Sequence, residues 1–166
     1  QETSKLIENV YSRQKKSAET RLALEGDLVL AHLEAKKAWD LGATEAQMKD
    51  ILQDIRHAQW RWDYGAASHG GSFHSPVEIA RVYATGMSKV QDARIKLARL
   101  LASLGFNEPI VMPDIASKNK AQEYIGLDMD KLVSEKETFK KEVIPGWLEE
   151  AKAREAKMEV KSSGIK

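Results

Sequence analysis

The chain has 166 residues, of which 42% are hydrophobic and 31% are charged, and its 26 basic residues nearly balance its 25 acidic residues. These values are typical of a globular chain and exclude wholesale disorder and a collagen-like fibre. The net charge of +1 gives no electrostatic indication of nucleic-acid binding. Because no stretch of the sequence approaches 18 apolar residues, no membrane span is expected.

The chain contains no cysteine. Within these residues this excludes disulfides, thiolate metal sites, a cysteine nucleophile and the C-x-x-C-H attachment of c-type haem. The sequence also lacks the glycine-rich nucleotide loops, G-x-S-x-G and H-E-x-x-H. The chain begins at Gln1 without a signal-peptide pattern, and we expect the protein to extend upstream of this residue.

Apolar residues recur at three- and four-residue steps from Thr3 to Leu41, which predicts a first helix of about 39 residues that ends before Gly42. Such a helix is about 58 Å long, whereas a compact chain of this size is about 40 Å across. The helix must therefore protrude or pack against something outside this chain. A symmetric homodimer through long helices is the simplest arrangement, and a break at Gly26 is the alternative.

Two capping patterns predict the next helices. Thr44 and Gln47 are spaced as a capping box, and the helix they open should run to about Asp63. Ser75 and Glu78 repeat this spacing, with a proline at the first helical position between them. A third long helix is therefore predicted to begin there, after a glycine-rich bend.

The last third of the chain is predicted to contain shorter helices. Ser117 and Asp128 are candidate caps, and Pro145 should end or kink the helix that Asp128 opens. Residues 147–158 allow a further amphipathic turn or two, and the tail from Lys161 is expected to fray.

The predicted fold is all-α, a long-helix bundle of about four to five helices with dimerising long helices. Its long-helix region covers 1–104 and includes a bend at 64–75. A linker follows at 105–116, and the C-terminal helices occupy 117–166.

Two of the four histidines are expected to be structural. His32 shares its helix face with Leu28 and Trp39, which favours a buried, hydrogen-bonded core histidine over a ligand. His57 lies among charged and amide side chains, which favours a solvated or ion-paired role. Tryptophans flank Arg61: Trp62 is expected in the core, and Trp60 is expected to face a partner or ligand.

The other two histidines, His69 and His74, fall in the glycine-rich bend, where a backbone with few Cβ atoms lets a flat group approach closely. His74 directly precedes the cap of the third long helix, and the positive end of a helix disfavours an imidazolium. A neutral imidazole is the form that binds a metal. His74 is therefore suited to be a ligand, although lone loop histidines without such a role are common.

A longer pattern surrounds these histidines. The sequence reads His-Ala-Gln-Trp-Arg-Trp-Asp-Tyr at 57–64, Ala-Ser-His-Gly at 67–70 and Phe-His-Ser-Pro-Val-Glu at 73–78. Shorter matches in the same order and spacing extend from Glu34 to Trp147. In these residues the chain resembles the C-terminal helical region of the ammonia-forming multihaem cytochrome c nitrite reductase.

The resemblance implies a periplasmic parent enzyme that carries five c-type haems and reduces nitrite to ammonia with six electrons. The attachment sites of haem c, the catalytic residues and a calcium site would all lie upstream. The present chain would then be a fragment that is not catalytic alone. Its partners would be the rest of the parent chain and, through the long helices, a second copy.

One site residue follows from the resemblance. His74 would be the distal axial ligand of one haem iron, with the bend at 64–75 facing that haem. No ligand role is implied for His32, His57 or His69, although His69 is a candidate to support the bend or a haem propionate. The alternative is a self-contained helical interaction module without a redox role.

Overall fold

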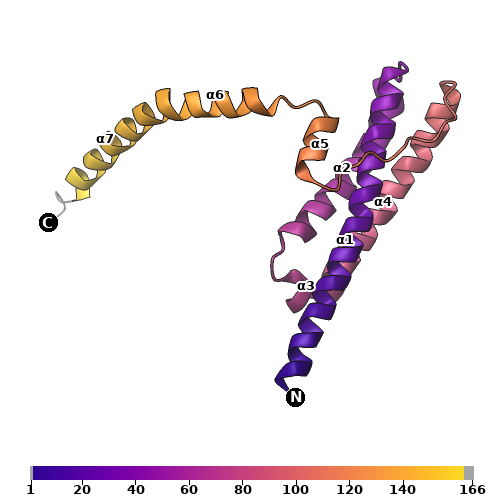
Figure 1. Cartoon of the computed structure of the whole chain (residues 1–166), viewed down its shortest axis with the longest axis horizontal. Coiled ribbons are helices and arrows are strands. Elements are labelled where there is room, and N and C mark those ends of the chain that lie inside the picture. Colours follow the sequence, from indigo (N-terminus) through magenta and orange to yellow (C-terminus); the bar gives the residue numbers. More distant parts are fainter. Residues whose placement is uncertain (1, 163–166) are drawn as a thin grey trace. The chain divides into compact units, whose positions relative to one another are not determined.

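The structure is a computed structural model that describes the backbone of residues 2–162 and the side chains up to Met158. All regular structure in this range is helical, and the first helix has 38 residues. The predicted all-α class and the unbroken first helix are therefore confirmed. The helices are α1 (Thr3–Asp40), α2 (Glu45–Ala67), α3 (Gly71–His74), α4 (Pro76–Ser103), α5 (Lys118–Tyr124), α6 (Met129–Glu142) and α7 (Ile144–Ser162) (Figure 1).

There are more helices than predicted because of α3 and α7. The four-residue α3 lies inside the predicted bend, where glycines do not prevent a single helical turn. Pro145 ends α6, as predicted, and it also lies in the first turn of α7. A first-turn proline is tolerated because its missing N–H has no partner within the helix.

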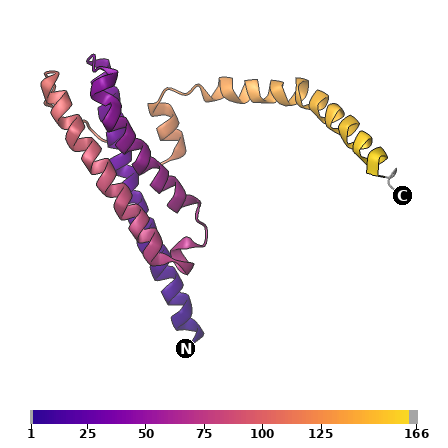
Figure 2. The same ribbon diagram turned by 180° about the vertical axis from the view of Figure 1, so that it is seen from behind.

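The chain divides into two compact units between Met112 and Pro113, a point that falls within the predicted linker 105–116. In the first unit, α1, α2 and α4 lie side by side, and α4 packs against both others (Figures 1 and 2). Its core consists of apolar side chains from all three helices: Leu24, Leu28, Ala31, Ala35, Ala38, Ala43, Met48, Ile51, Ile55, Ala58, Ile79, Tyr83, Val90, Ala93, Leu97 and Leu101.

The helix ends of this unit follow the sequence signals in most places. Gly42 and Gly105 have positive φ angles of 88° and 85°, a conformation that glycine adopts without strain after a helix. Thr44 accepts a hydrogen bond from the backbone N–H of Gln47 and completes the predicted capping box. The second predicted capping box is wrong: the side chain of Ser75 makes no cap bond.

The end of α2 also differs from the prediction, because the helix continues past Asp63 to Ala67. Gly65 is the cause. A Cβ at this position would lie 2.5 Å from Cζ and 2.7 Å from the hydroxyl oxygen of Tyr83, so only a glycine lets the last turn of α2 approach α4. The helix ends at Ala67, and the hydroxyl of the following Ser68 donates a hydrogen bond to the carbonyl of Tyr64.

The second unit contains α5, α6 and α7. Ser117 and Asp128 accept hydrogen bonds from backbone N–H groups three residues on, which confirms both predicted caps. None of its described side chains, residues 113–158, is buried. Lys161 belongs to α7, and residues 163–166 of the predicted frayed tail lie outside the described residues. Among residues 2–162, no helix combines the length and apolarity needed to cross a membrane.

The contact between Gly65 and Tyr83 predicts the effect of adding one methyl group. The Gly65→Ala substitution should lower the free energy of unfolding by about 1–3 kcal/mol, because a fully packed aromatic ring has no room to move. Urea unfolding of the chain measures this. The matched control is Gly26→Ala, where the new Cβ would meet one atom at 3.7 Å, and an unchanged or raised stability is expected there.

Candidate functional site

His74 is the last residue of α3 and is separated from α4 by Ser75 alone. Its backbone N–H donates a hydrogen bond to the carbonyl of Gly70 at 2.9 Å, and this bond closes the single turn. The side chain is exposed, and within the described residues its imidazole makes no hydrogen bond. The ring nitrogens are therefore available to an outside group.

The imidazole lies against Gly70. A Cβ on this glycine would be 3.0 Å from Cδ2 and 3.7 Å from Nε2 of His74, so a larger residue would press on the ring. The ring of Phe73 is edge-on to the imidazole, with centroids 5.0 Å apart. The backbone of the bend and one aromatic ring thus hold the imidazole on two sides.

Exposed apolar side chains lie close to His74 in the chain. Phe73 is 39% exposed, and Val77, in the first turn of α4, is 82% exposed. On the last turns of α2, the rings of Trp60 and Tyr64 stack at 5.8 Å and are also exposed. Trp60 therefore faces away from the core, as predicted. The exposed ring of Phe73 beside the free imidazole of His74 suits a flat apolar ligand.

A metal held only by this chain is not supported. No group of three or more His, Asp or Glu side chains within the described residues could hold a metal ion. A metal at His74 would therefore need its other ligands from elsewhere. A porphyrin meets this need, because it leaves only the axial positions of its iron to protein side chains.

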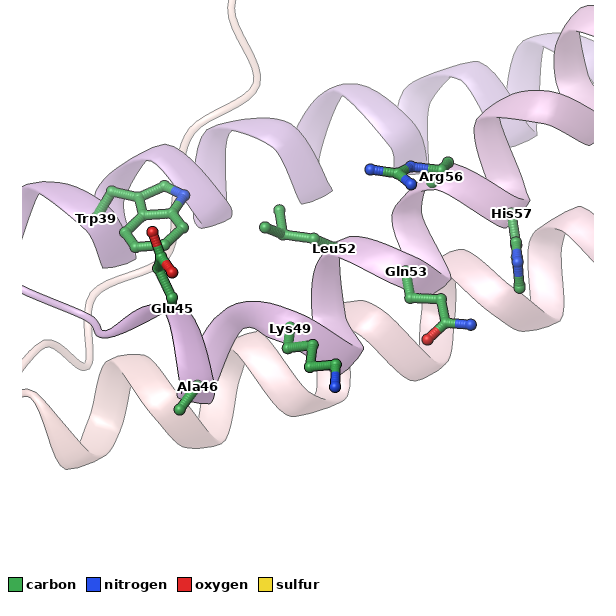
Figure 3. Close-up of a pocket in the computed structure, with 8 residues that line it drawn as sticks. All are labelled: Trp39, Glu45, Ala46, Lys49, Leu52, Gln53, Arg56 and His57. Atoms are coloured by element: carbon green, nitrogen blue, oxygen red, sulfur yellow. The ribbon is translucent and has the colours of Figure 1, made fainter.

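The remaining histidines occupy different settings. The predicted burial of His32 is wrong: its side chain is exposed, because the helix face toward α2 and α4 passes through Ala31 and Ala35 instead. His57 is half-buried and lines a groove of about 730 Å³ on α1 and the first half of α2, together with Trp39, Leu52 and Arg56 (Figure 3). His69 is exposed in the bend.

Two ionic clusters join the long helices, and sequence reasoning missed both. Arg94 of α4 donates hydrogen bonds to Asp27 at 2.7 Å and to Glu34 at 2.8 Å, both on α1. Asp54 of α2 accepts from Lys89 at 3.1 Å and from Lys96 at 2.6 Å, both on α4. Only the packing of the helices brings these partners together, because they are at least 35 residues apart in sequence.

The two ionic clusters shift the pKa values of Asp54 and Arg94. Burial alone would raise the pKa of the Asp54 carboxyl, but the hydrogen bonds and charges of Lys96 and Lys89 outweigh it and hold the pKa below its ordinary value of 3.8. The hydrogen bonds that Arg94 donates to Glu34 are the main cause that raises the pKa of its guanidinium. Asp54 and Arg94 therefore remain charged at neutral pH.

Comparison with known proteins assigns this helical arrangement to a class. The family model described as cytochrome c552 matches residues 1–158. Cytochrome c-552 of Bacteroides thetaiotaomicron is 57% identical over 148 residues, that of Porphyromonas gingivalis 52% over 149, and that of Parabacteroides distasonis 53% over 146. These alignments cover 88–90% of the chain, which spans 30% of the length of each relative.

The matches define the class as c-type cytochromes, which carry haem c and transport electrons through its iron. The chain belongs to the cytochrome c552 family. Because it has no cysteine, its 166 residues cannot themselves form the thioether bonds of haem c.

The identification made from the sequence is corrected by these findings. The matching family is cytochrome c552, and the relatives are named cytochrome c-552, so the assignment to ammonia-forming nitrite reductase is replaced. The enzyme assignment, with its reduction of nitrite, is withdrawn with it. The physical reason is that the residues behind the resemblance are caps, helix surfaces and a bend, which report on a fold and not on a reaction. The calcium site, expected outside this chain, stays a prediction.

The Asp54 cluster predicts a pH-dependent loss of stability. Its contribution is complete well above pH 3.8 and is lost as the pH falls through the lower folded-state pKa. The Asp54→Asn variant should lose about 1–3 kcal/mol of unfolding free energy at pH 7, and its deficit should shrink below pH 4. Urea unfolding across this range measures both. Asp63→Asn, exposed on the same helix, should stay within about 0.5 kcal/mol of the parent chain.

Proposed function

We propose that this chain is an electron-transfer part of a c-type cytochrome, and that His74 is the distal axial ligand of one haem iron. The observation that carries the proposal is the exposed imidazole without a hydrogen-bond partner, held against Gly70. The haem would be attached through cysteines outside these 166 residues. An iron with both axial positions filled passes electrons without binding a substrate.

The residues around His74 fit such a group. Gly70 leaves room for the ring where a Cβ would press on it, and Phe73 and Val77 offer apolar surface to a porphyrin. Ser75 and Pro76, which begin α4, tie the ligand to a helix packed in the core. This chain would need to supply only one ligand, because the porphyrin would occupy the equatorial positions and the second axial ligand would come from outside these 166 residues. These features do not support an interaction module without a redox role.

The second unit is proposed to pack on the rest of a longer protein. Its helices α6 and α7 leave Phe139, Trp147 and Leu148 substantially exposed, and their own contact, an edge-on pair of Phe139 and Trp147 at 5.3 Å, buries neither ring. Exposed apolar side chains in this number favour a partner surface. The relatives, of which the chain spans 30%, have enough additional length to supply one.

A homodimer through α1 is proposed as a second contact. Apart from its core face, α1 carries another apolar stripe at steps of four and seven residues, formed by Ile7, Tyr11, Ala18, Leu22, Val29 and Leu33. Tyr11 and Leu22 are 67% and 56% exposed. A helix about 57 Å long with two apolar stripes suits packing on its own unit and on a second copy.

The proposed location is the periplasm. The cytochrome c552 family, whose members are typically periplasmic, supports this proposal.

Replacing the proposed ligand tests the function. In the full-length, haem-loaded protein, His74→Ala should convert one haem from six-coordinate low spin to five-coordinate high spin, because an axial nitrogen is lost. Optical absorption and electron paramagnetic resonance measure the change. His32→Ala removes an exposed histidine from the middle of α1 and should leave every haem low spin. A low-spin spectrum that survives His74→Ala would contradict the assignment.

The dimer proposal has a separate test. Leu22→Arg places a charge in the centre of the second stripe and should weaken self-association of the full-length protein by about tenfold or more, or about 1.4 kcal/mol. Sedimentation velocity at several concentrations measures this. Ala23→Arg adds the same charge at an exposed position about 100° around the helix and should not change association. Equal behaviour of the two variants would refute the α1 interface.

A further inference from the structure

We infer that a small cavity beside the bend binds a carboxylate, and that a propionate of the haem at His74 supplies it. The inference rests on the proposed function, because it requires a haem at that position. The cavity has a volume of about 190 Å³. This is too small for a whole cofactor, whose pockets usually exceed about 300 Å³, but it is large enough for the end of an acidic side arm.

The cavity is built from five parts of the first unit, one of which is the end of α2 with Gly65 and Ala66. Ser17 and Arg21 come from α1, His69 from the bend, Ser72 from α3 and Tyr83 from α4. None of the residues that line it is acidic. Its polar side-chain groups are thus hydroxyls, the Gln14 amide, an imidazole and one permanent positive charge, a set that favours an anion.

The strongest indication of a ligand is the unsatisfied side chain of Arg21. Its Nε is buried, and within the described residues it has no hydrogen-bond partner. No carboxylate of the described chain pairs with its guanidinium, whereas Arg94, on the neighbouring helix, is paired with two. A buried donor on a charged group is normally satisfied, and a planar guanidinium matches a carboxylate with two parallel hydrogen bonds.

Tyr83 supports this view from the opposite wall. Burial raises the pKa of its hydroxyl, while the charge of Arg21 and the hydroxyl of Ser17 act in the opposite direction. The phenol is therefore neutral at physiological pH and does not neutralise Arg21. The positive charge of Arg21 stays available to an incoming anion.

The cavity and the proposed iron ligand share the same bend. Ser72 lies two residues before His74, and His69 precedes Gly70, against which the imidazole lies. A haem bound at His74 would bring its two propionates into this neighbourhood. The bend would then bind the iron through His74, and His69 and Ser72 would lie beside the propionate.

The experiment uses the full-length, haem-loaded protein with Arg21→Gln, Arg21→Lys and the control Arg56→Gln, which lies in the groove on the first half of α2. Arg21→Gln should lower the midpoint potential of the His74-ligated haem, because loss of a positive charge favours the oxidised iron. The pH range over which this potential varies should move upward, since the propionate loses the charge that lowers its pKa. Arg21→Lys should keep most of the midpoint potential and of its pH dependence, because the positive charge remains. Arg56→Gln should change neither quantity.

The charged and titratable groups facing the proposed carboxylate are Arg21 from α1, His69 from the bend and Tyr83 from α4; α2 and α3 contribute none. Arg21→Gln with an unchanged potential and pH profile would overturn the inference. A second measurement compares the melting temperature in sodium acetate with that in sodium chloride at equal ionic strength. If acetate raises the melting temperature of the parent protein but not that of Arg21→Gln, the bound carboxylate is a free acid and the propionate assignment is wrong. The low-spin spectrum should persist in all three variants, so His74 ligation, tested by His74→Ala, can fail separately.

Discussion

The close contact between Gly65 of α2 and the buried ring of Tyr83 on α4 is the constraint on which the site depends. It lets the last turn of α2 pack on α4, and only three residues separate this helix from α3. The chain must then turn sharply, and the turn places His74 at the start of α4 with its ring against Gly70. A packed core thereby supports the bend that carries the exposed His74.

The same packing decides where the charges lie. Arg94 bridges α4 to α1, and Asp54 bridges α2 to α4, so each helix pair that α4 makes carries one partly buried ionic cluster. Apolar contacts alone tolerate sliding of one helix along another, whereas a carboxylate that must meet two cations tolerates little. The clusters therefore fix the register of helices whose surfaces are otherwise repetitive.

The two units differ in how far they stabilise themselves. The first has a core of leucine, isoleucine and alanine side chains with one methionine, one valine and one tyrosine, and the bend with His74 lies beside it. The second has well-capped helices but no buried side chain among residues 113–158. Capping and propensity can specify helices, but tertiary packing supplies most of their stability in a folded protein. The second unit is thus the part of the chain that most needs a partner surface.

The sequence by itself determined the helices, because their signals are local: periodic apolar residues in α1, the Thr44 cap, and glycines after α1 and α4. It also singled out His74, since glycines and a helix start around a histidine are visible in the order of residues. Tertiary structure alone decided the exposure of His32, the partners of Arg94 and Asp54, and the isolation of Arg21 beside the bend. These features depend on side-chain contacts between helices that are far apart in the chain, and no local sequence pattern specifies such contacts.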